Sequence, residues 1–191
     1  MAVIQVAPQR CVLLNDAHHI GIDGVSFNFV VRDLMALYQG QSPPPVQHTF
    51  FECAALLAQR VKANQEKLDT FWDKELSGPL PDLALPTDFP RPKESAYEGD
   101  HLLSQIESHE LQKLKECAKQ RRVSLYMLLV AAYTAFLHRL TGQEDILVGT
   151  PVAGRNCPEA RETVGMFVNT TVLRNFPKPG TPFEAFLDEV K

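Results

Sequence analysis

Two adjacent histidines followed by an Asp-Gly pair are the residues of this chain whose types and spacing could do chemistry. They are His18 and His19, and Asp23 and Gly24 follow shortly after them. A neutral imidazole accepts a proton near neutral pH, and a helix start offers free backbone N–H groups to a developing oxyanion. The pattern therefore indicates a general base beside an oxyanion site. A second interpretation is a surface turn in which Asp23 caps the following helix and one histidine is buried and hydrogen-bonded.

The elements around this motif are predicted from the spacing of apolar residues. Apolar runs of strand length cover 2–6 and 11–15, and 25–38 has the three- and four-residue apolar spacing of a helix. The histidines then lie between a strand and a helix, on rigid elements that can hold a reacting group. Further along, 50–76 predicts one long helix whose apolar stripe includes Trp72 as a core residue.

The second half of the chain predicts another α/β unit behind a proline-rich connector. The connector covers 80–100 and favours extended and turn conformations; a polyproline ligand for a partner is the weaker alternative. The elements expected beyond it are a strand over 101–106, helices over 108–121 and 125–140, strands over 145–151 and 167–173, and a helix that starts within 181–184.

The ends of these helices carry capping signals. Ser108 and Ser124 are the expected N-caps of the first two helices, and Thr181 to Glu184 has the spacing of a capping box. The helix over 125–140 is apolar almost throughout, so we expect it to be buried on most faces.

Composition excludes several classes of protein. The chain has 191 residues, 45% of them hydrophobic, and a formal charge of −4 without a basic patch, which argues against nucleic-acid binding. No apolar run reaches the roughly 20 residues that a membrane helix needs, and no secretory leader is visible. The four cysteines are widely spaced, which favours buried free thiols over a disulfide framework or a metal site. We expect a cytoplasmic α/β protein.

A second constellation lies in the last third of the chain, where Arg155 follows a glycine-containing strand end. With these residues the chain resembles the condensation domains of nonribosomal peptide synthetases, which belong to the chloramphenicol acetyltransferase-like superfamily with its HxxxD signature. The resemblance rests on four stretches in the family's order: His18–Gly24, Leu85–Pro92, Gly149–Arg155 and Val164–Arg174. The motif that the family has at the start of the long helix is degenerate here, at Phe50–Leu56.

The resemblance implies an α/β fold, the two-lobe sandwich of the chloramphenicol acetyltransferase-like superfamily. It implies that the chain is an incomplete domain, a fragment that spans the middle and includes parts of both lobes. Residues 1–79 would be the C-terminal part of the N-terminal lobe, 80–100 the inter-lobe connector, and 101–191 the first part of the C-terminal lobe.

The resemblance also implies amide formation between two substrates tethered to carrier proteins. His19 matches the histidine of the HxxxD signature, so it is the candidate to position the attacking amine or to accept its proton. Neighbouring side chains in an extended segment point to opposite sides, so His18 is expected to pack or hydrogen-bond behind the loop. A direct catalytic part for His18 is the alternative.

The remaining site residues take their expected roles from the same resemblance. Asp23 is expected to form a buried bidentate ion pair with Arg155 that holds the histidine loop, in preference to a catalytic relay; an exposed Arg155 is the alternative. Gly24 would let a backbone N–H approach the oxyanion. Asn169 lies on a strand expected to approach the channel, where it would bind the pantetheine arm or satisfy backbone groups.

The implied partners are upstream and downstream peptidyl carrier proteins, which present 4′-phosphopantetheine, and an adjacent adenylation domain. No directly bound cofactor or metal is expected. A basic helix face could meet an acidic carrier protein or be a solvated surface; its members are Lys113, Lys115, Lys119, Arg121 and Arg122. The other histidines lack partners at ligand spacing: His48, His101, His109 and His138.

Two alternatives remain within the resemblance. One is an epimerisation or ester-forming relative, because these share the HHxxxDG pattern. The other is a non-catalytic fragment that retains only a carrier-docking or lobe-interface surface. A cyclisation variant is disfavoured, since it replaces the histidines by aspartates.

Overall fold

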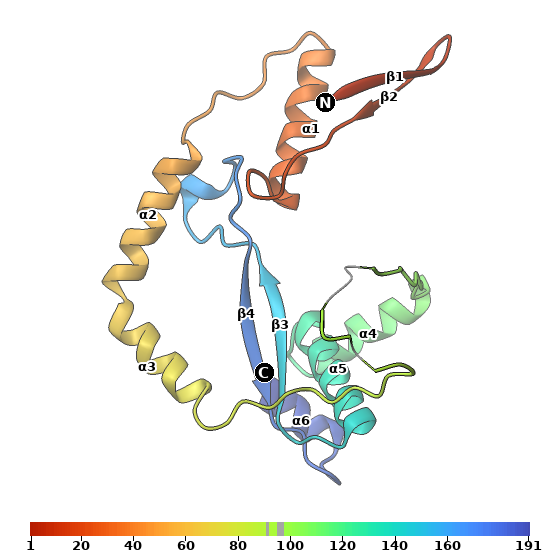
Figure 1. Ribbon diagram of the computed structural model, residues 1–191, viewed down its shortest axis with the longest axis vertical. Helices are drawn as coiled ribbons and strands as arrows, with labels where there is room; N and C mark the ends of the chain where they lie inside the picture. The colour runs from red at the N-terminus through yellow and green to blue at the C-terminus, as the bar shows by residue number, and fades with distance from the viewer. Residues whose placement is uncertain (91, 95–97) are drawn as a thin grey trace. The chain divides into compact units, whose positions relative to one another are not determined.

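The structure is a computed structural model that describes residues 1–90, 92–94 and 98–191. The chain forms six α-helices and four β-strands within these residues (Figure 1). In chain order they are β1 (Ala2–Ala7), β2 (Arg10–Leu14), α1 (Gly24–Tyr38), α2 (Phe50–Ala63), α3 (Gln65–Glu75), α4 (Ser108–Gln120), α5 (Leu125–Thr141), β3 (Ile146–Val152), β4 (Asn169–Asn175) and α6 (Phe183–Val190), with a short 3₁₀ turn at Pro158–Ala160. Arg91 of the Leu85–Pro92 motif and residues 95–97 of the connector lie outside the described residues.

The chain divides into two compact units, each built from two separate stretches of sequence. Unit 1 contains Met1–Lys74 and Thr150–Thr171, and unit 2 contains Glu75–Gly149 and Val172–Lys191. This grouping differs from a division at the proline-rich connector, because 150–171 joins the N-terminal stretch. The assignment of residues to the lobes of a larger domain stays a prediction.

Unit 1 begins with the two predicted strands and the predicted helix; the strands pair as an antiparallel hairpin, and the Asp23 cap of the alternative interpretation is present. The strands β1 and β2 pair with Ala2 opposite Leu14 and Ile4 opposite Val12. Asp23 is the N-cap of α1, and its side chain accepts a hydrogen bond from the N–H of Ser26. The loop between β2 and α1 therefore leaves a paired strand and ends at a fixed helix start.

The predicted single helix over 50–76 is wrong, because the chain forms two helices that are separated at Asn64. The Asn64 side-chain amide donates to the carbonyl of Arg60 at 2.8 Å, and the Asn64 carbonyl accepts from the N–H of Leu68. Asparagine competes in this way with the backbone for helix hydrogen bonds. Trp72 is only half-buried and meets Phe71 edge-on, with ring centroids 5.0 Å apart, so its assignment to the core was also wrong.

The core of unit 1 joins α2 to the segment that follows β3. Its buried members are Cys53, Cys157, Ala160 and Phe167, with Phe50 and Leu57 packed against them. Thr49 and Glu52 form a capping box at the start of α2, which fixes the direction in which the helix enters this core. The prediction of buried free thiols holds for Cys53 and Cys157, whereas Cys11 and Cys117 are exposed.

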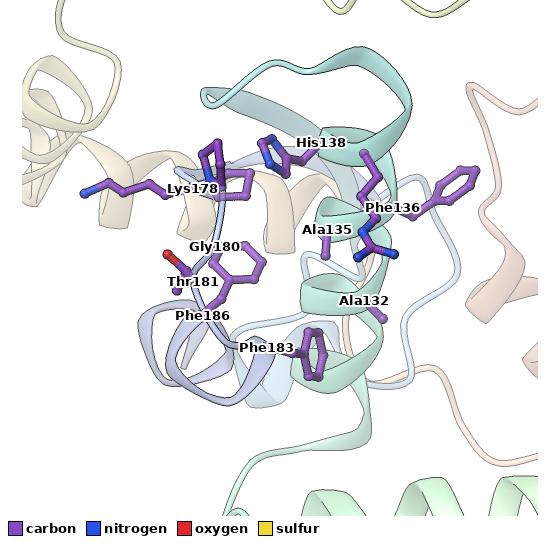
Figure 2. A pocket seen from close by; sticks show the side chains of 12 residues that line it. Ala132, Ala135, Phe136, His138, Lys178, Gly180, Thr181, Phe183 and Phe186 are labelled. Atoms are coloured by element: carbon purple, nitrogen blue, oxygen red, sulfur yellow. The ribbon is translucent and has the colours of Figure 1, made fainter.

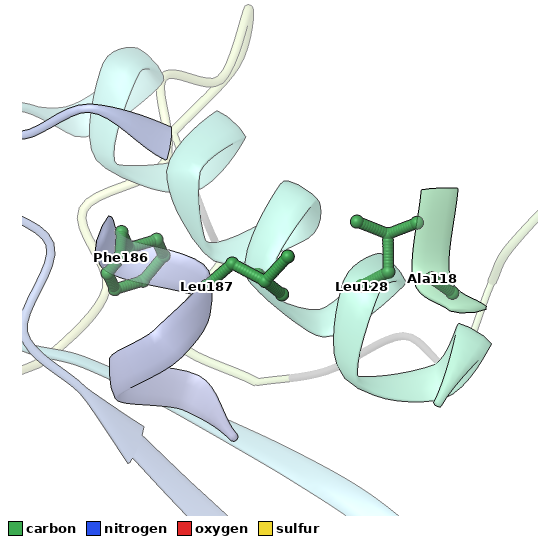
Figure 3. Close-up of a cluster of buried hydrophobic side chains, with 5 residues drawn as sticks. Ala118, Leu128, Phe186 and Leu187 are labelled. Atoms are coloured by element: carbon green, nitrogen blue, oxygen red, sulfur yellow. The ribbon is translucent and has the colours of Figure 1, made fainter. Parts of the chain in front are cut away.

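Unit 2 is held by a cluster in which α4, α5 and α6 meet (Figure 3). The buried side chains are Ala118, Leu128, Ala131, Phe186 and Leu187. Ser124 caps α5, and Gly142 ends it in the left-handed conformation at φ 74°, as the sequence predicts. Only one stripe of α5 is buried, however, and Tyr133 and Phe136 are more than half exposed. The expectation of burial on most faces was wrong.

Three further predictions in unit 2 are corrected. Residues 101–106 form no strand: no described segment pairs with them, and an isolated strand leaves its backbone groups without hydrogen-bond partners. Helix α4 is capped by Glu107, which forms a capping box with Glu110, and Ser108 is its first helical residue. Helix α6 begins after Pro182 without a side-chain cap, so the capping box predicted from Thr181 does not form.

Strands β3 and β4 pair with each other, and Arg174 of β4 is tied to two earlier segments of the chain. Its guanidinium forms a two-nitrogen fork with the Asp145 carboxylate at 2.9 and 2.6 Å. It also donates to the carbonyls of Glu75 and Ser77 at 3.0 and 2.9 Å. Arg174 thus fixes the start of the connector to the strand pair within unit 2.

Among the described residues, no single helix is long and apolar enough to cross a membrane; α4 and α5 reach the required length and composition only as a pair, and that pair is bent by 101°.

Candidate active site

Both histidines lie exposed on the loop between β2 and α1. The loop contains a turn in which the N–H of Gly21 donates to the His18 carbonyl at 3.0 Å. The Nδ1 of His18 accepts from the N–H of Ile20 at 3.1 Å, so this ring folds back on its own loop. His18 also lines a shallow hollow beside Ile22 and Val30. The ring of His19 has no hydrogen-bond partner among the described residues, so this imidazole is free to meet a ligand.

Asp23 lies directly after the loop and is completely buried in its side chain. One carboxylate oxygen accepts from the N–H of Ser26 at 2.7 Å, and the other accepts from the N–H of Phe167 at 3.0 Å. The Asp23 backbone N–H donates to the carbonyl of Gly165 at 3.3 Å. Asp23 therefore joins the start of α1 to the segment 165–167, which is distant in sequence.

Arg155 and Asp23 are brought together as an ion pair inside unit 1. A single guanidinium nitrogen, Nη2, reaches both carboxylate oxygens at 3.0 and 3.2 Å, in place of the two-nitrogen fork that a bidentate pair implies. The other terminal nitrogen donates to the carbonyls of Ala160 and Thr163. The guanidinium carbon lies 4.3 Å from the centroid of the Phe167 ring. Most of the donor capacity of Arg155 is thus used within the protein, which leaves it little capacity to bind a substrate.

The charge of Asp23 is stabilised by these contacts. Burial alone raises its pKa, but the N–H groups of Ser26 and Phe167 and the side chain of Arg155 outweigh that effect. The result is a pKa lowered from 3.8 to about 2. Asp23 therefore stays ionised at any pH near neutrality and has no free proton to exchange in a relay.

Neither Gly24 nor Asn169 is among the residues that form hydrogen bonds with Asp23 or Arg155. Gly24 is the first residue of α1, and open space lies where its Cβ would be. The N–H groups of Gly24 and Val25 have no acceptor among the described residues, so they remain available to an oxyanion. Asn169 is the exposed first residue of β4, and its side-chain oxygen accepts from the N–H of Thr170 at 2.8 Å.

Sequence reasoning missed two residues of this site, Ser26 and Gly165. The Ser26 hydroxyl donates to the Gly165 carbonyl at 2.8 Å and accepts from Arg155 Nη2 at 2.6 Å. A Cβ on Gly165 would lie 2.2 Å from the Phe50 ring, so only glycine fits there. The sequence does hold one signal for Ser26. Serine is a modest helix former, so its presence at the third position of a helix suggests a role for its hydroxyl.

A second hollow lies in unit 2, between α5 and the segment that leads into α6 (Figure 2). Ala135, His138, Lys178 and Phe186 are among its lining residues. None of the predicted site residues lines this hollow. It does contain His138, whose Nδ1 is hydrogen-bonded to the carbonyl of Gln143 at 2.7 Å.

A loop with two histidines, closed by a buried Asp–Arg pair at a helix start, defines the chain as an α/β protein of the HxxxD class. The chain belongs to the condensation domain family, which it matches over residues 1–191. The α/β class and the condensation-domain fold, of chloramphenicol acetyltransferase type, are thereby confirmed. Amide-bond formation in nonribosomal peptide synthetases is the general role of this family.

Relatives of the chain are parts of large synthetases. It is 41% identical over 192 residues to surfactin synthase subunit 1 of Bacillus subtilis, in an alignment that covers all of this chain and 5% of that protein. It is 40% identical to bacitracin synthase 1 of Bacillus licheniformis over 99% of this chain and 4% of the relative. The chain thus spans a small part of the length of these relatives.

The solved structures include the first condensation domain of the calcium-dependent antibiotic synthetase in complex with a substrate analogue. The two structures superpose with a TM-score of 0.65 at 27% sequence identity. The match covers 91% of this chain and 39% of the solved chain.

Proposed function

We propose that this chain supplies the histidine loop of a condensation domain that forms an amide bond between two carrier-bound thioesters. The observation that supports it most directly is that the exposed His19 lies on the loop that ends at the buried Asp23–Arg155 pair, at the start of α1. An attack on a carbonyl requires a base and hydrogen-bond donors for the oxyanion, and the loop and the helix start offer one of each kind of group.

In the proposed reaction, the amine nitrogen of an aminoacyl thioester attacks the carbonyl carbon of an acyl or peptidyl thioester. The new C–N bond forms, His19 positions the amine and accepts its proton, and the carbonyl oxygen becomes an oxyanion. The N–H groups of Gly24 and Val25 stabilise that oxyanion. The oxyanion then collapses, the C–S bond breaks, and the departing sulfur takes up the proton that His19 accepted and leaves as a thiol. The thioester thus supplies the driving force and no nucleotide is consumed.

His18 and Asn169 take supporting parts in this proposal. The hydrogen bond from the N–H of Ile20 to His18 Nδ1 favours a role for His18 in shaping the loop. Asn169 is exposed at the start of β4, so its amide can meet the arm of a bound substrate.

The proposed substrates arrive on the 4′-phosphopantetheine arms of upstream and downstream peptidyl carrier proteins, and an adenylation domain loads them. The synthetases that the chain resembles support these partners. An epimerisation or ester-forming activity is the second candidate, because the same loop would serve it. It predicts turnover of a single tethered substrate or of an alcohol acceptor.

The test replaces the matching segment of surfactin synthase subunit 1, which is 41% identical, by residues 1–191 of this chain. The host is loaded with its own acyl and aminoacyl carriers, and single-turnover amide formation is measured by mass spectrometry. We expect amide product from the wild-type graft and a loss of about 100-fold or more with His19→Ala.

The matched control is His18→Ala, which removes the neighbouring ring. Circular dichroism and thermal melting of each graft show whether it is folded. A folded His19→Ala graft that retains the wild-type rate contradicts the assigned mechanism. A folded wild-type graft that converts only an alcohol acceptor or a single tethered substrate favours the second candidate.

A further inference from the structure

We propose that Ser26 is a positioning residue for the His18–His19 loop, acting through its hydroxyl group on Gly165 and Arg155. Its consequence for turnover rests on the proposed function, whereas its effect on the loop does not. Neither the HHxxxDG pattern nor the Asp23–Arg155 pair includes this serine.

The Ser26 hydroxyl uses all of its hydrogen-bonding capacity inside the protein. It donates to the Gly165 carbonyl at 2.8 Å, and it accepts from the Gly165 N–H at 3.0 Å and from Arg155 Nη2 at 2.6 Å. A hydroxyl offers one donor and two acceptor lone pairs, so all three positions are filled. Ser26 is 0% exposed, so water cannot replace any of these bonds.

These contacts reach the histidine loop through one shared carbonyl. The Gly165 oxygen accepts from the Ser26 hydroxyl and also from the backbone N–H of Asp23, which ends the loop. Ser26 therefore holds the acceptor in the position at which Asp23 can reach it. Because the His19 ring has no partner of its own, the position of His19 depends on this backbone anchor.

The Gly165 backbone cannot shift to compensate for a missing hydroxyl. It lies against the first residue of α2, since a Cβ on Gly165 would be 2.2 Å from the Phe50 ring. The Phe50 ring is itself packed edge-on against Phe167, with centroids 5.1 Å apart. Loss of the hydroxyl would leave buried polar groups of Gly165 and Arg155 unpaired between fixed neighbours.

The test compares Ser26→Ala and Ser26→Cys with Thr163→Val in the full chain. Alanine removes the hydroxyl without adding bulk, whereas cysteine puts a larger and weakly hydrogen-bonding group in its place, so an effect that both variants share is due to the lost hydrogen bonds. Thr163 is a second buried hydroxyl of unit 1, which donates to the Glu159 carbonyl at 2.7 Å, and valine has its shape. It therefore controls for a general loss of stability.

Amide hydrogen exchange at Asp23 is the first readout, because this N–H depends on the Gly165 carbonyl. We expect both Ser26 variants to accelerate exchange at Asp23 by about tenfold more than they accelerate exchange in the core of α2. Thr163→Val removes a hydroxyl beside Cys53 of α2, so it should not accelerate exchange at Asp23 more than in the core of α2. In the synthetase graft, the Ser26 variants should lower kcat by about tenfold while KM for the aminoacyl carrier stays within about threefold.

Wild-type-like exchange at Asp23 in Ser26→Cys overturns the proposal, because packing alone then holds the loop. The proposal is also overturned if both Ser26 variants accelerate exchange at Asp23 by no more than they accelerate it in the core of α2. A graft that forms no amide, together with accelerated exchange at Asp23, contradicts the proposed function and leaves the positioning role supported.

Discussion

At the scale of single residues, Asp23 makes three contacts that together use both oxygens of its carboxylate. It caps α1 through the N–H of Ser26, accepts from the N–H of Phe167, and pairs with Arg155. No neutral side chain of that size offers two oxygens that accept only, so asparagine is not an adequate replacement.

The stability of the protein should therefore depend on Asp23 in acid. Its pKa is about 2 in the folded chain and 3.8 ordinarily, so its contribution is complete above about pH 5 and is lost as the pH falls toward 2. The stabilisation in that window is about 2 kcal/mol. Urea unfolding at a series of pH values measures it, with Asp23→Asn as the comparison.

Asp23→Asn should lower the free energy of unfolding at pH 7 by about 3 kcal/mol, because it leaves the Arg155 charge buried without its partner. The difference between the wild type and this variant should shrink as the pH falls. A difference that stays constant from pH 5 to about pH 2 would mean that the carboxylate is not the titrating group.

Replacing either histidine should have little effect on the free energy of unfolding. Both are exposed, and His18 makes one hydrogen bond within its own loop. His18→Ala and His19→Ala should each change the free energy of unfolding by about 0.5 kcal/mol or less. Chemical denaturation of the full chain measures this. A large loss for His19→Ala would show a structural role for its ring.

At the scale of elements, the turn after β3 depends on glycine. Gly154 has φ 67°, and a Cβ there would lie 1.9 Å from the Phe167 carbonyl oxygen. Gly154→Ala is therefore expected to cost about 3 kcal/mol or more, since strain in the backbone adds to a clash with backbone atoms that are held by Asp23.

Two other glycines separate these causes. Gly180 has φ 77° with open space around it, so Gly180→Ala should cost about 1 kcal/mol from backbone strain alone. Gly24 lies in α1 with open space, so Gly24→Ala should be neutral or slightly stabilising. Thermal and urea unfolding rank the three variants; equal losses at Gly154 and Gly180 would argue against the clash.

Arg174 has a similar role for the part of β4 that belongs to unit 2. Lysine cannot reproduce its fork with Asp145 together with its bonds to the carbonyls of Glu75 and Ser77. Arg174→Lys is expected to lower the protection of β4 amides by about 1–3 kcal/mol in hydrogen exchange. Arg161→Lys, at an exposed arginine, is the control; an equal loss there would contradict the anchoring role.

At the scale of the whole molecule, unit 1 consists of two stretches, 1–74 and 150–171. Residues 75–149, which lie between them in the sequence, belong to unit 2. A chain truncated after residue 79 lacks Arg155, Gly165 and Phe167 and so loses every long-range contact of Asp23. We expect the pKa of Asp23 to rise from about 2 toward 3.8 in that truncated chain. A carboxyl ¹³C titration by NMR measures both values; a pKa that stays near 2 would show that the local cap alone holds the charge.

The sequence by itself determined the elements whose signals are local. The hairpin strands, α1 and α5 follow from apolar spacing, and Ser124 and Gly142 mark the ends of α5 as expected. The family also follows from ordered motifs. Such signals involve residues that are close together in the chain, so they can be recognised in a sequence without knowledge of the tertiary structure.

Tertiary structure decided the contacts that join distant residues. Strand β4 starts at Asn169, two residues later than predicted, because the N–H of Phe167 is donated to Asp23 and not to a strand partner. Arg155 and Asp23 are 132 positions apart, and their geometry, with one nitrogen on both oxygens, depends on where Ser26 and Gly165 lie. Periodicity carries no information over that separation, because such contacts form only when burial brings the segments together.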